Sequence, residues 1–192
     1  MDWGTRIFWS LVAVLLGASV FFAQGAEAQR SLAKAAEATL ETGDLVKVIQ
    51  VVDGDSLVAE NEGGAKVGIR ILGIKALGRT PERDPAARFG RDAVTALEKL
   101  VKEEPVRVLV HSQGKDRHGR TLATLFVGDE DVGLALVKQG LALAYTVYPV
   151  PTMQLYLDAQ DDAQAAERGL WADAEIATRA RQISREWSRA AK

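Results

Sequence analysis

Apolar and polar positions alternate between residues 45 and 127 in a pattern that predicts five short strands. β-Branched residues occur in short runs, and turn residues such as Glu62-Gly63-Gly64 separate the runs. The first three runs are typical of a β-meander, and two more follow after an interruption. We expect strands at 45–52, 56–60, 66–74, 106–110 and 121–127.

Three helices are predicted by apolar residues at helical spacing and by their capping residues. Asp84-Pro85 is a cap followed by a first-turn proline, and an apolar stripe continues from Phe89 to about Lys102. Asp131 caps a short helix that ends at Gly140, and a third helix opens at Pro151-Thr152. A small closed Greek-key barrel requires this order, because closure removes the exposed edges of a short sheet. The predicted fold class is therefore mainly β with α (α+β), a five-stranded OB-type barrel with three helices over 44–173.

The C-terminal segment, residues 174–192, is predicted to form a basic amphipathic helix. One helical face carries apolar residues and another carries arginines. Five basic and two acidic residues occur in this segment, a modest excess. Such a helix can touch anionic lipid or nucleic acid, but we expect it to pack locally. The apolar face holds Ile176, Ala180, Ile183 and Trp187, and the basic face Arg181, Arg185 and Arg189.

The N-terminus has the pattern of a targeting or anchoring segment. Residues 7–23 are almost uninterruptedly apolar, and the chain then changes abruptly to small and polar residues. Residues 1–28 are therefore expected to be a signal peptide cleaved after Ala28, or a membrane anchor through 7–23 if cleavage does not occur. Either alternative implies an extracytoplasmic protein. It would be secreted or periplasmic after cleavage, and membrane-anchored without it. Residues 29–43 are predicted to be a helical spacer.

Composition excludes several kinds of chemistry. The chain has 192 residues, of which 47% are hydrophobic, and this indicates a folded globular protein rather than a disordered one. Cysteine is absent and there are two histidines, so no thiol or haem chemistry and no zinc site built on these residues is expected.

The net charge of −2 conceals a local positive excess. Seven basic and two acidic residues occur between Lys66 and Arg91, and four basic residues and one acidic residue between Arg107 and Arg120. These stretches predict a phosphate-binding face on an acidic body. The alternative is a solvated surface with local ion pairs.

Three clusters carry candidate chemistry. Asp53-Gly54-Asp55-Ser56 places two carboxylates in the turn between the first two strands, where they can hold a cation or cap backbone amides. Arg70 interrupts an otherwise apolar strand, so it requires a buried partner or an anionic ligand. Arg120 ends the string Asp116-Arg117-His118-Gly119-Arg120, and two arginines can form a fork around one phosphate.

Six motifs in consistent order resemble the thermonuclease (staphylococcal nuclease-like) family. The resemblance extends from about Val46 to Trp171. The motifs are Asp53-Gly54-Asp55-Ser56, Gly68-Ile69-Arg70-Ile71-Leu72-Gly73-Ile74, Phe89-Gly90, Asp116-Arg117-His118-Gly119-Arg120, Leu136-Val137-Lys138-Gln139-Gly140-Leu141-Ala142 and Gly169-Leu170-Trp171.

The resemblance implies a barrel that cleaves DNA and RNA with the help of calcium. By this resemblance, Asp55 matches a calcium-binding aspartate, and Arg70 and Arg120 match the arginines that hold the scissile phosphate. The cation and the guanidinium groups would neutralise charge that develops on the phosphoryl oxygens.

One motif departs from the family pattern where the metal and the base belong. The family has Ile-Asp-Thr-Pro-Glu after the arginine strand, whereas this chain has Ile74-Lys75-Ala76-Leu77-Gly78. Lys75 thus replaces the second calcium-binding aspartate and Gly78 the glutamate, so bound Ca²⁺ is possible but poorly supported and the attacking water lacks a base. A bulged loop could bring Glu82 into the vacant place as a displaced base.

We therefore hypothesise a nucleic-acid-binding pseudoenzyme. The Lys75 ammonium would pair with Asp55 and keep the pocket positive without activating water, unless Lys75 simply points into solvent. Candidate nucleic-acid-binding residues are Arg70, Lys75, Arg79, Arg117, Arg120, Tyr145 and Tyr148. Two alternatives remain: an active calcium-dependent endonuclease, and a non-catalytic envelope barrel that binds proteins.

Overall fold

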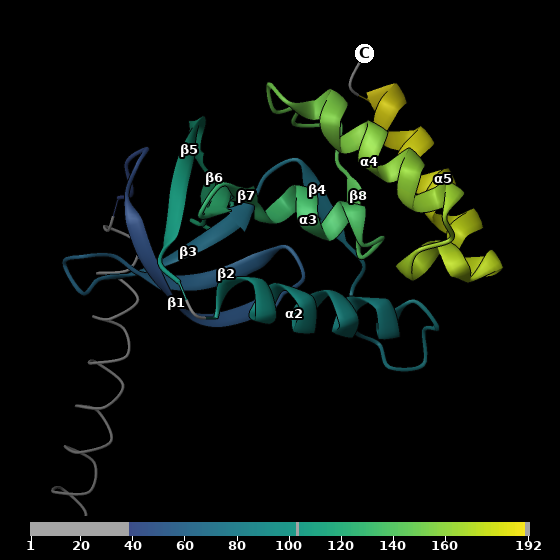
Figure 1. Ribbon diagram of the computed structural model, residues 1–192, viewed down its shortest axis with the longest axis horizontal. Helices are drawn as coiled ribbons and strands as arrows, with labels where there is room; N and C mark the ends of the chain where they lie inside the picture. The colour runs from purple at the N-terminus through teal and green to yellow at the C-terminus, as the bar shows by residue number, and fades with distance from the viewer. Residues whose placement is uncertain (1–38, 103, 191–192) are drawn as a thin grey trace, which may run out of the picture. The chain divides into compact units, whose positions relative to one another are not determined.

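The computed structural model describes residues 39–102 and 104–190 (Figure 1). The expected leader over 1–28 and the spacer residues 29–38 lie outside the described residues. Residues 39–43, which the sequence predicts as the end of a helical spacer, instead form a turn on the barrel. The Gly43 amide donates to the Val108 carbonyl at 2.8 Å, and the Val110 amide donates to Thr42 Oγ1 at 3.1 Å.

The five-stranded barrel predicted from the sequence is present. Its sheet has the order β3-β2-β1-β5-β6-β7, and it closes because β3 also pairs with β6 in parallel. Closure leaves few edges for so short a sheet. The strands are β1 (Leu45–Asp53), β2 (Ser56–Glu60), β3 (Lys66–Ile71), β5 (Val106–Lys115), β6 (Thr121–Val127) and the short β7 (Glu130–Asp131).

The single strand predicted over 66–74 is wrong, because the chain turns at Gly73 and continues as a separate strand, β4 (Ile74–Ala76). Gly73 has a φ of +76°, and a Cβ there would lie 3.2 Å from both Tyr156 and Val150. Beyond the turn, β4 pairs with β8 (Ala142–Ala144) in a two-stranded sheet of its own. Because of this break, Lys75 belongs to the two-stranded sheet and not to the sheet of the barrel. The fourth strand is also longer than predicted, since β5 continues to Lys115.

The described part of the chain contains four α-helices, three in the predicted barrel domain and one after it. They are α2 (Ala87–Val101), α3 (Val132–Lys138), α4 (Met153–Ala165) and α5 (Ala174–Ala190). Asp131 caps α3 as predicted, since its carboxylate accepts from the Leu134 amide at 3.0 Å. Asp84 does not cap α2, which begins at Ala87, because its carboxylate accepts from the Ala86 amide ahead of the helix. No helix among residues 39–102 and 104–190 is long and apolar enough to cross a bilayer.

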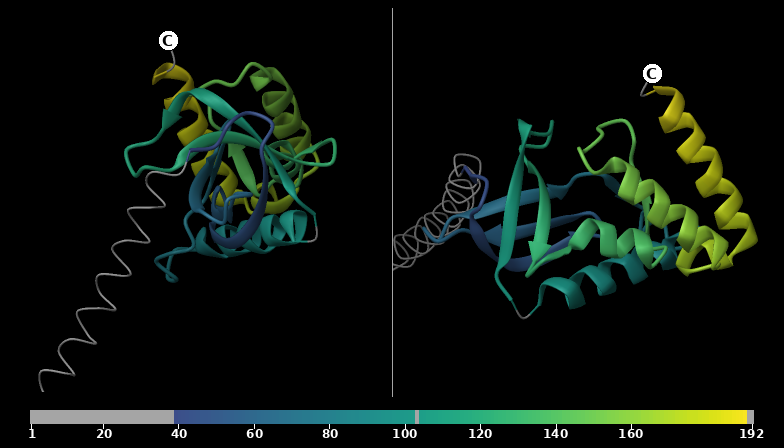
Figure 2. Two further views of the ribbon diagram at one scale, coloured as in Figure 1. Left: turned by 90° about the vertical axis from the view of Figure 1, so that its left-hand side faces the viewer. Right: turned by 45° about the horizontal axis from the view of Figure 1, so that its top comes forward.

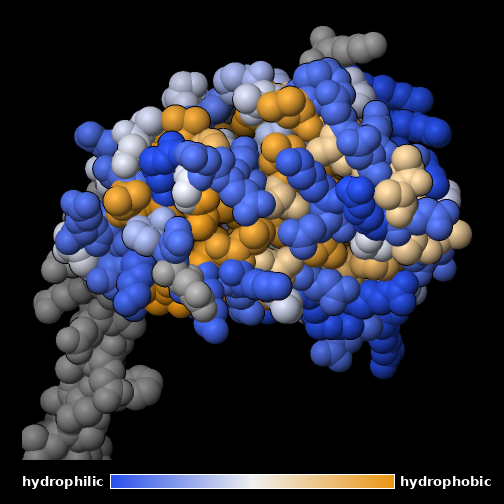
Figure 3. Space-filling model, viewed as in Figure 1, coloured by the Kyte–Doolittle hydropathy of each residue, from blue (hydrophilic) through white to orange (hydrophobic). Residues whose placement is uncertain are grey.

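Two apolar cores hold these elements together. The barrel interior contains fully buried side chains such as Leu57, Ile69 and Leu125. A second cluster joins α5 to the start of α2, to β8 and to the short 3₁₀ helix η1 (Gly169–Ala172). The strands gather at one end of the domain, and α4 and α5 lie at the other (Figures 1 and 2). On the face shown in Figure 3, apolar residues are exposed near the middle, and hydrophilic residues surround them.

Gly140 and Gly169 bring two distant segments into backbone contact. The Leu170 amide donates to the Gly140 carbonyl at 2.9 Å, and both glycines have positive φ, +68° and +54°. A Cβ at Gly140 would overlap the Arg168 carbonyl, which is backbone and cannot rotate away. Position 140 therefore requires glycine for two reasons: no Cβ fits against the Arg168 backbone, and the backbone has a positive φ.

We expect Gly140→Ala to lower the free energy of unfolding by about 3 kcal/mol, since left-handed strain and overpacking add. Gly128→Ala is the matched control, because Gly128 has a φ of +56° but a Cβ added there would meet no atom within 4 Å. Gly128→Ala should lower the free energy of unfolding by about 1 kcal/mol, because only the left-handed strain applies there. Urea unfolding of both variants measures the difference, and equal costs would contradict the packing argument.

Candidate functional site

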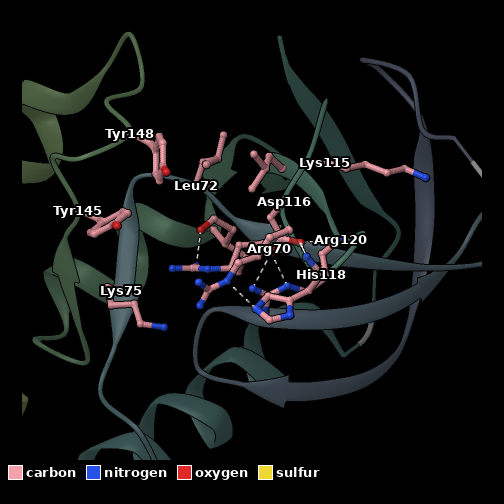
Figure 4. Close-up of a pocket in the computed structure, with 12 residues that line it drawn as sticks. Arg70, Leu72, Lys75, Lys115, Asp116, His118, Arg120, Tyr145 and Tyr148 are labelled. Carbon is pink, nitrogen blue, oxygen red and sulfur yellow. Dashed lines mark hydrogen bonds and ion pairs between the residues drawn. The ribbon is translucent and has the colours of Figure 1, made fainter. Parts of the chain in front are cut away.

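A cavity of about 480 Å³ opens where β3, β4, the β5–β6 turn and the segment after β8 meet (Figure 4). Cationic side chains dominate its lining, and Asp116 is the carboxylate among the lining residues. An excess of cations in a concave site concentrates anions. The cationic lining residues are Arg70, Lys75, Lys115, Arg117 and Arg120.

Arg70, from β3, is held by protein groups at both terminal nitrogens. Nη1 donates to the carbonyls of Asp55 and Ile71 at 3.0 and 2.6 Å, and Nη2 donates to the Ile74 carbonyl at 2.8 Å. Nη2 also lies 3.1 Å from the Asp55 carboxylate. Three backbone carbonyls and one carboxylate thus hold the terminal nitrogens of Arg70, so few of their donors are left for a ligand.

Asp55 is the acceptor at the centre of this arrangement. It is 1% exposed, and its Oδ2 accepts from the Ala76 amide at 3.0 Å while Oδ1 accepts from the Ser56 hydroxyl at 3.1 Å. Burial raises the pKa of Asp55 above its ordinary value, although Arg70 and Lys75 oppose the shift. Burial likewise lowers the pKa of Arg70, with Asp55 opposing. The pair is therefore costly to bury and depends on its hydrogen bonds.

Lys75, from β4, forms the ion pair that the sequence predicts. Its Nζ lies 3.1 Å from Asp55 Oδ2, and its side chain remains 47% exposed. Figure 4 shows Lys75 below Tyr145, with its ammonium directed toward the middle of the view, where Arg70 lies. Lys75 thus neutralises Asp55 from the solvent side while two of its three donors remain for other partners.

The residues around Asp55 do not fit a calcium ion. Calcium takes six to eight oxygen ligands, whereas both Asp55 oxygens are already engaged and two cations lie 3.1 Å from Oδ2. Asp53 is the other carboxylate of this turn, and its Oδ1 accepts from the Asp55 amide at 3.0 Å. Burial raises the pKa of Asp53, but hydrogen bonds from Asp55 outweigh it and leave a net lowering. Within the described residues, no group of three or more potential metal ligands occurs.

Arg120 is anchored by Asp116 at the entrance to β6. Its Nε donates to Asp116 Oδ2 at 2.7 Å, and its Nη1 donates to the Ser56 hydroxyl at 2.7 Å. Since Ser56 in turn donates to Asp55, one network joins the β5–β6 turn to the Arg70 ion pair. Burial raises the pKa of Asp116, but hydrogen bonds from Arg120 and two backbone amides outweigh it, so the pKa lies below its ordinary value.

The remaining predicted residues divide between the cavity and its surroundings. Arg117 lines the cavity, and its Nε donates to His118 Nε2 at 3.1 Å. Arg79 and Glu82 are exposed in the loop after β4 and do not belong to the lining. The structure therefore does not bring Glu82, the candidate displaced base, together with Arg70 and Arg120.

Tyr145 and Tyr148 form an aromatic wall on the opposite side of the cavity from Arg120 (Figure 4). Their ring centroids lie 5.9 Å apart, and Tyr148 is 47% exposed. Behind them, Trp187 of α5 meets the Tyr145 ring edge-on, with centroids 4.8 Å apart and an interplanar angle of 90°. The sequence identifies Trp187 only as part of an apolar helix face, because no local pattern reports a contact between residues so far apart along the chain.

Known proteins were compared with the chain. A profile of the family described as "Staphylococcal nuclease homologue" matches residues 68–173. An "Uncharacterized endonuclease" of Haemophilus influenzae is 38% identical over 127 residues, 66% of each chain and so just under two thirds of that relative. The "Thermonuclease" of Staphylococcus hyicus is 30% identical over 128 residues, covering 66% of this chain and 75% of the relative. An "Uncharacterized endonuclease" of Escherichia coli O157:H7 is 31% identical over 130 residues, 67% and 78%.

We expect Asp116→Asn to lower the free energy of unfolding at pH 7 by about 1.5 kcal/mol, because Arg120 loses a charged acceptor. The folded-state pKa of Asp116 is depressed, so its contribution is present above pH 3.8 and is lost as the pH falls through the lower folded value. The difference from the unaltered chain should therefore shrink in urea unfolding at about pH 3. Asp129→Asn, at an exposed carboxylate, is the control, and a pH-independent difference would contradict the linkage.

Proposed function

Since the chain belongs to the staphylococcal nuclease homologue family, we propose that its cationic cavity binds the phosphodiester backbone of nucleic acid while hydrolysis is weak or absent. The observation that carries this proposal is the Lys75–Asp55 ion pair at 3.1 Å. It puts a fixed positive charge where the sequence resemblance implies a metal. The apolar run over 7–23 supports the further proposal that the protein acts outside the cytoplasm.

Phosphate binding follows from the charges and donors that the cavity offers. Lys75 and Arg117 have exposed side chains, and Arg70, which also lines the cavity, contributes its charge. Positive charges that converge on a concave surface attract a polyanion and orient its phosphates. Because the pocket gives few fixed bidentate donors, we expect weak and strongly salt-dependent binding.

Efficient hydrolysis is not supported by the groups around the cavity. Phosphodiester cleavage needs a base or a metal to activate water. The Asp55 oxygens are taken by hydrogen bonds and ion pairs, Gly78 has no side chain to act as a base, and Glu82 lies outside the lining. Arg70 and Arg120 could still stabilise transition-state charge. The other groups of the lining that could act as a base are already engaged: His118 Nε2 accepts from Arg117 Nε at 3.1 Å, and Asp116 Oδ2 accepts from Arg120 Nε at 2.7 Å.

A second candidate function is favoured by the names of the relatives, two of which are called endonucleases and one a thermonuclease. In this alternative the chain is an active endonuclease that uses Glu82 after the loop between β4 and α2 moves. The two functions differ in one measurable property, which is cleavage that depends on calcium.

For binding, we expect Lys75→Gln and Arg117→Gln each to weaken the affinity for a single-stranded oligonucleotide about three- to tenfold at low salt. Each should also reduce the slope of log K against log salt concentration by about 0.7, the loss of one phosphate contact. Fluorescence anisotropy titrations over a salt series measure both quantities.

Lys66→Gln is the matched control, since Lys66 is an exposed lysine of β3 that does not line the cavity. These variants are preferable to Arg70→Ala, which would leave buried Asp55 without a partner and destabilise the barrel. Binding that ignores both salt and the cavity substitutions would instead indicate a barrel that binds proteins.

For catalysis, we expect the purified chain to cleave plasmid DNA no faster with calcium than with a chelator. The double variant Lys75→Asp with Gly78→Glu should gain calcium-dependent cleavage of at least about tenfold, since a general base alone is worth about 10²–10⁴. The uncharged pair Lys75→Asn with Gly78→Gln is the control and should gain nothing. Calcium-dependent cleavage by the unaltered chain, abolished by Glu82→Gln, would establish the active endonuclease instead.

A further inference from the structure

The C-terminal helix α5 lies beyond the family match, which ends at residue 173, yet it contacts a residue that lines the cavity. Its residue Trp187 packs edge-on against Tyr145, which lines the cavity beside Tyr148. One side chain of the cavity wall is thus packed against an element that the match to the family does not include.

α5 is fixed to the rest of the domain by charged groups at its start. The Asp173 carboxylate accepts from the Ile176 amide at 3.1 Å and also pairs with Arg88 of α2 at 2.6 Å. One turn later, Arg179 pairs with Asp84 at 2.8 Å. These contacts set where the helix begins and its direction over the start of α2, although each exposed pair by itself contributes little stability.

The apolar face of α5 then fixes its rotation. Ile176 and Ala180 are 1% exposed in the second core, together with Leu143 of β8. Ile183 and Trp187 continue the same face at helical spacing, so the ring of Trp187 is directed at the segment that follows β8. Tyr145 is two residues after Leu143, and its amide donates to the Gly73 carbonyl at 2.8 Å.

Tyr145 therefore has a fixed backbone and an aromatic neighbour on each side, Trp187 behind it and Tyr148 in front. Edge-to-face aromatic pairs have a preferred geometry, so Trp187 restricts the orientation of the Tyr145 ring. Burial raises the pKa of the Tyr145 hydroxyl, so this ring is neutral at physiological pH. A neutral, oriented ring beside cationic groups offers a stacking surface next to a phosphate site.

We propose that Trp187 is a positioning residue that orients Tyr145 for stacking on an unpaired base of a strand bound in the cavity. This inference rests on the proposed function and deepens it. Duplex DNA keeps its bases stacked on each other, so only an unpaired strand can present a base face to Tyr145 and Tyr148 while its phosphate meets Lys75.

The test compares two ligands of equal length and charge, a single-stranded oligonucleotide and its fully abasic counterpart. Trp187→Ala in the full chain should weaken binding of the base-bearing strand about three- to tenfold and leave binding of the abasic strand unchanged, because only stacking is lost. Trp187→Phe keeps an aromatic edge and should restore most of the affinity. The NMR shifts of the Tyr145 ring protons should move in the alanine variant without any ligand.

Ile183→Ala is the control for helix packing, since Ile183 lies on the same face of α5 in the second core. It should reduce stability without changing the ratio of the two affinities. Equal weakening of both ligands by Trp187→Ala, or no weakening of either, would overturn the positioning role. If the unaltered chain binds neither ligand, the proposed function fails instead, and the two failures are thus distinct.

Discussion

The buried Asp55 carboxylate imposes the constraint on which the rest of the site depends. A carboxylate removed from water must be matched by cations and hydrogen-bond donors, or its burial costs several kcal/mol. Here the partners come from two successive strands: Arg70 of β3, and the Lys75 ammonium and the Ala76 amide of β4. The turn at Gly73 is what brings β4 back toward Asp55. Satisfying one charge thereby determines the path of the chain at the cavity wall.

The same contacts limit what the site can do. Arg70 is held by three backbone carbonyls and by the Asp55 carboxylate, and Arg120 is held by Asp116 and Ser56. Both guanidinium groups are rigid sources of positive potential rather than open forks for a phosphate. Lys75 has the opposite character, because it is half exposed and can turn one ammonium donor toward a ligand while it stays near Asp55. The lining is thus mostly cationic, and Asp55, the carboxylate that the resemblance assigns to a metal, is the one that Lys75 neutralises.

The sequence predicts the barrel well because alternation and β-branched runs record which face of each strand is buried. It also predicts the Asp55–Lys75 pair, since the resemblance assigns both Asp55 and the position that Lys75 occupies to one calcium site. It does not predict the break at Gly73, because a positive φ inside an apolar run leaves no periodic signal. Nor does it predict that the Arg70 partners include three backbone carbonyls, or that Trp187 meets Tyr145, because both depend on how distant segments fold together.

The position of α5 shows why a site need not end where a family match ends. The matched segment supplies the charges, whose positions depend on strands paired within the barrel. The aromatic wall belongs to the loop after β8, where strand pairing ends at Ala144 and the Tyr145 amide still donates to the Gly73 carbonyl, so the backbone of Tyr145 is held while its ring needs a further contact. α5 supplies that support through the second core and Trp187. A helix added outside the barrel can therefore change which ligands fit while the charged half of the cavity stays as it is.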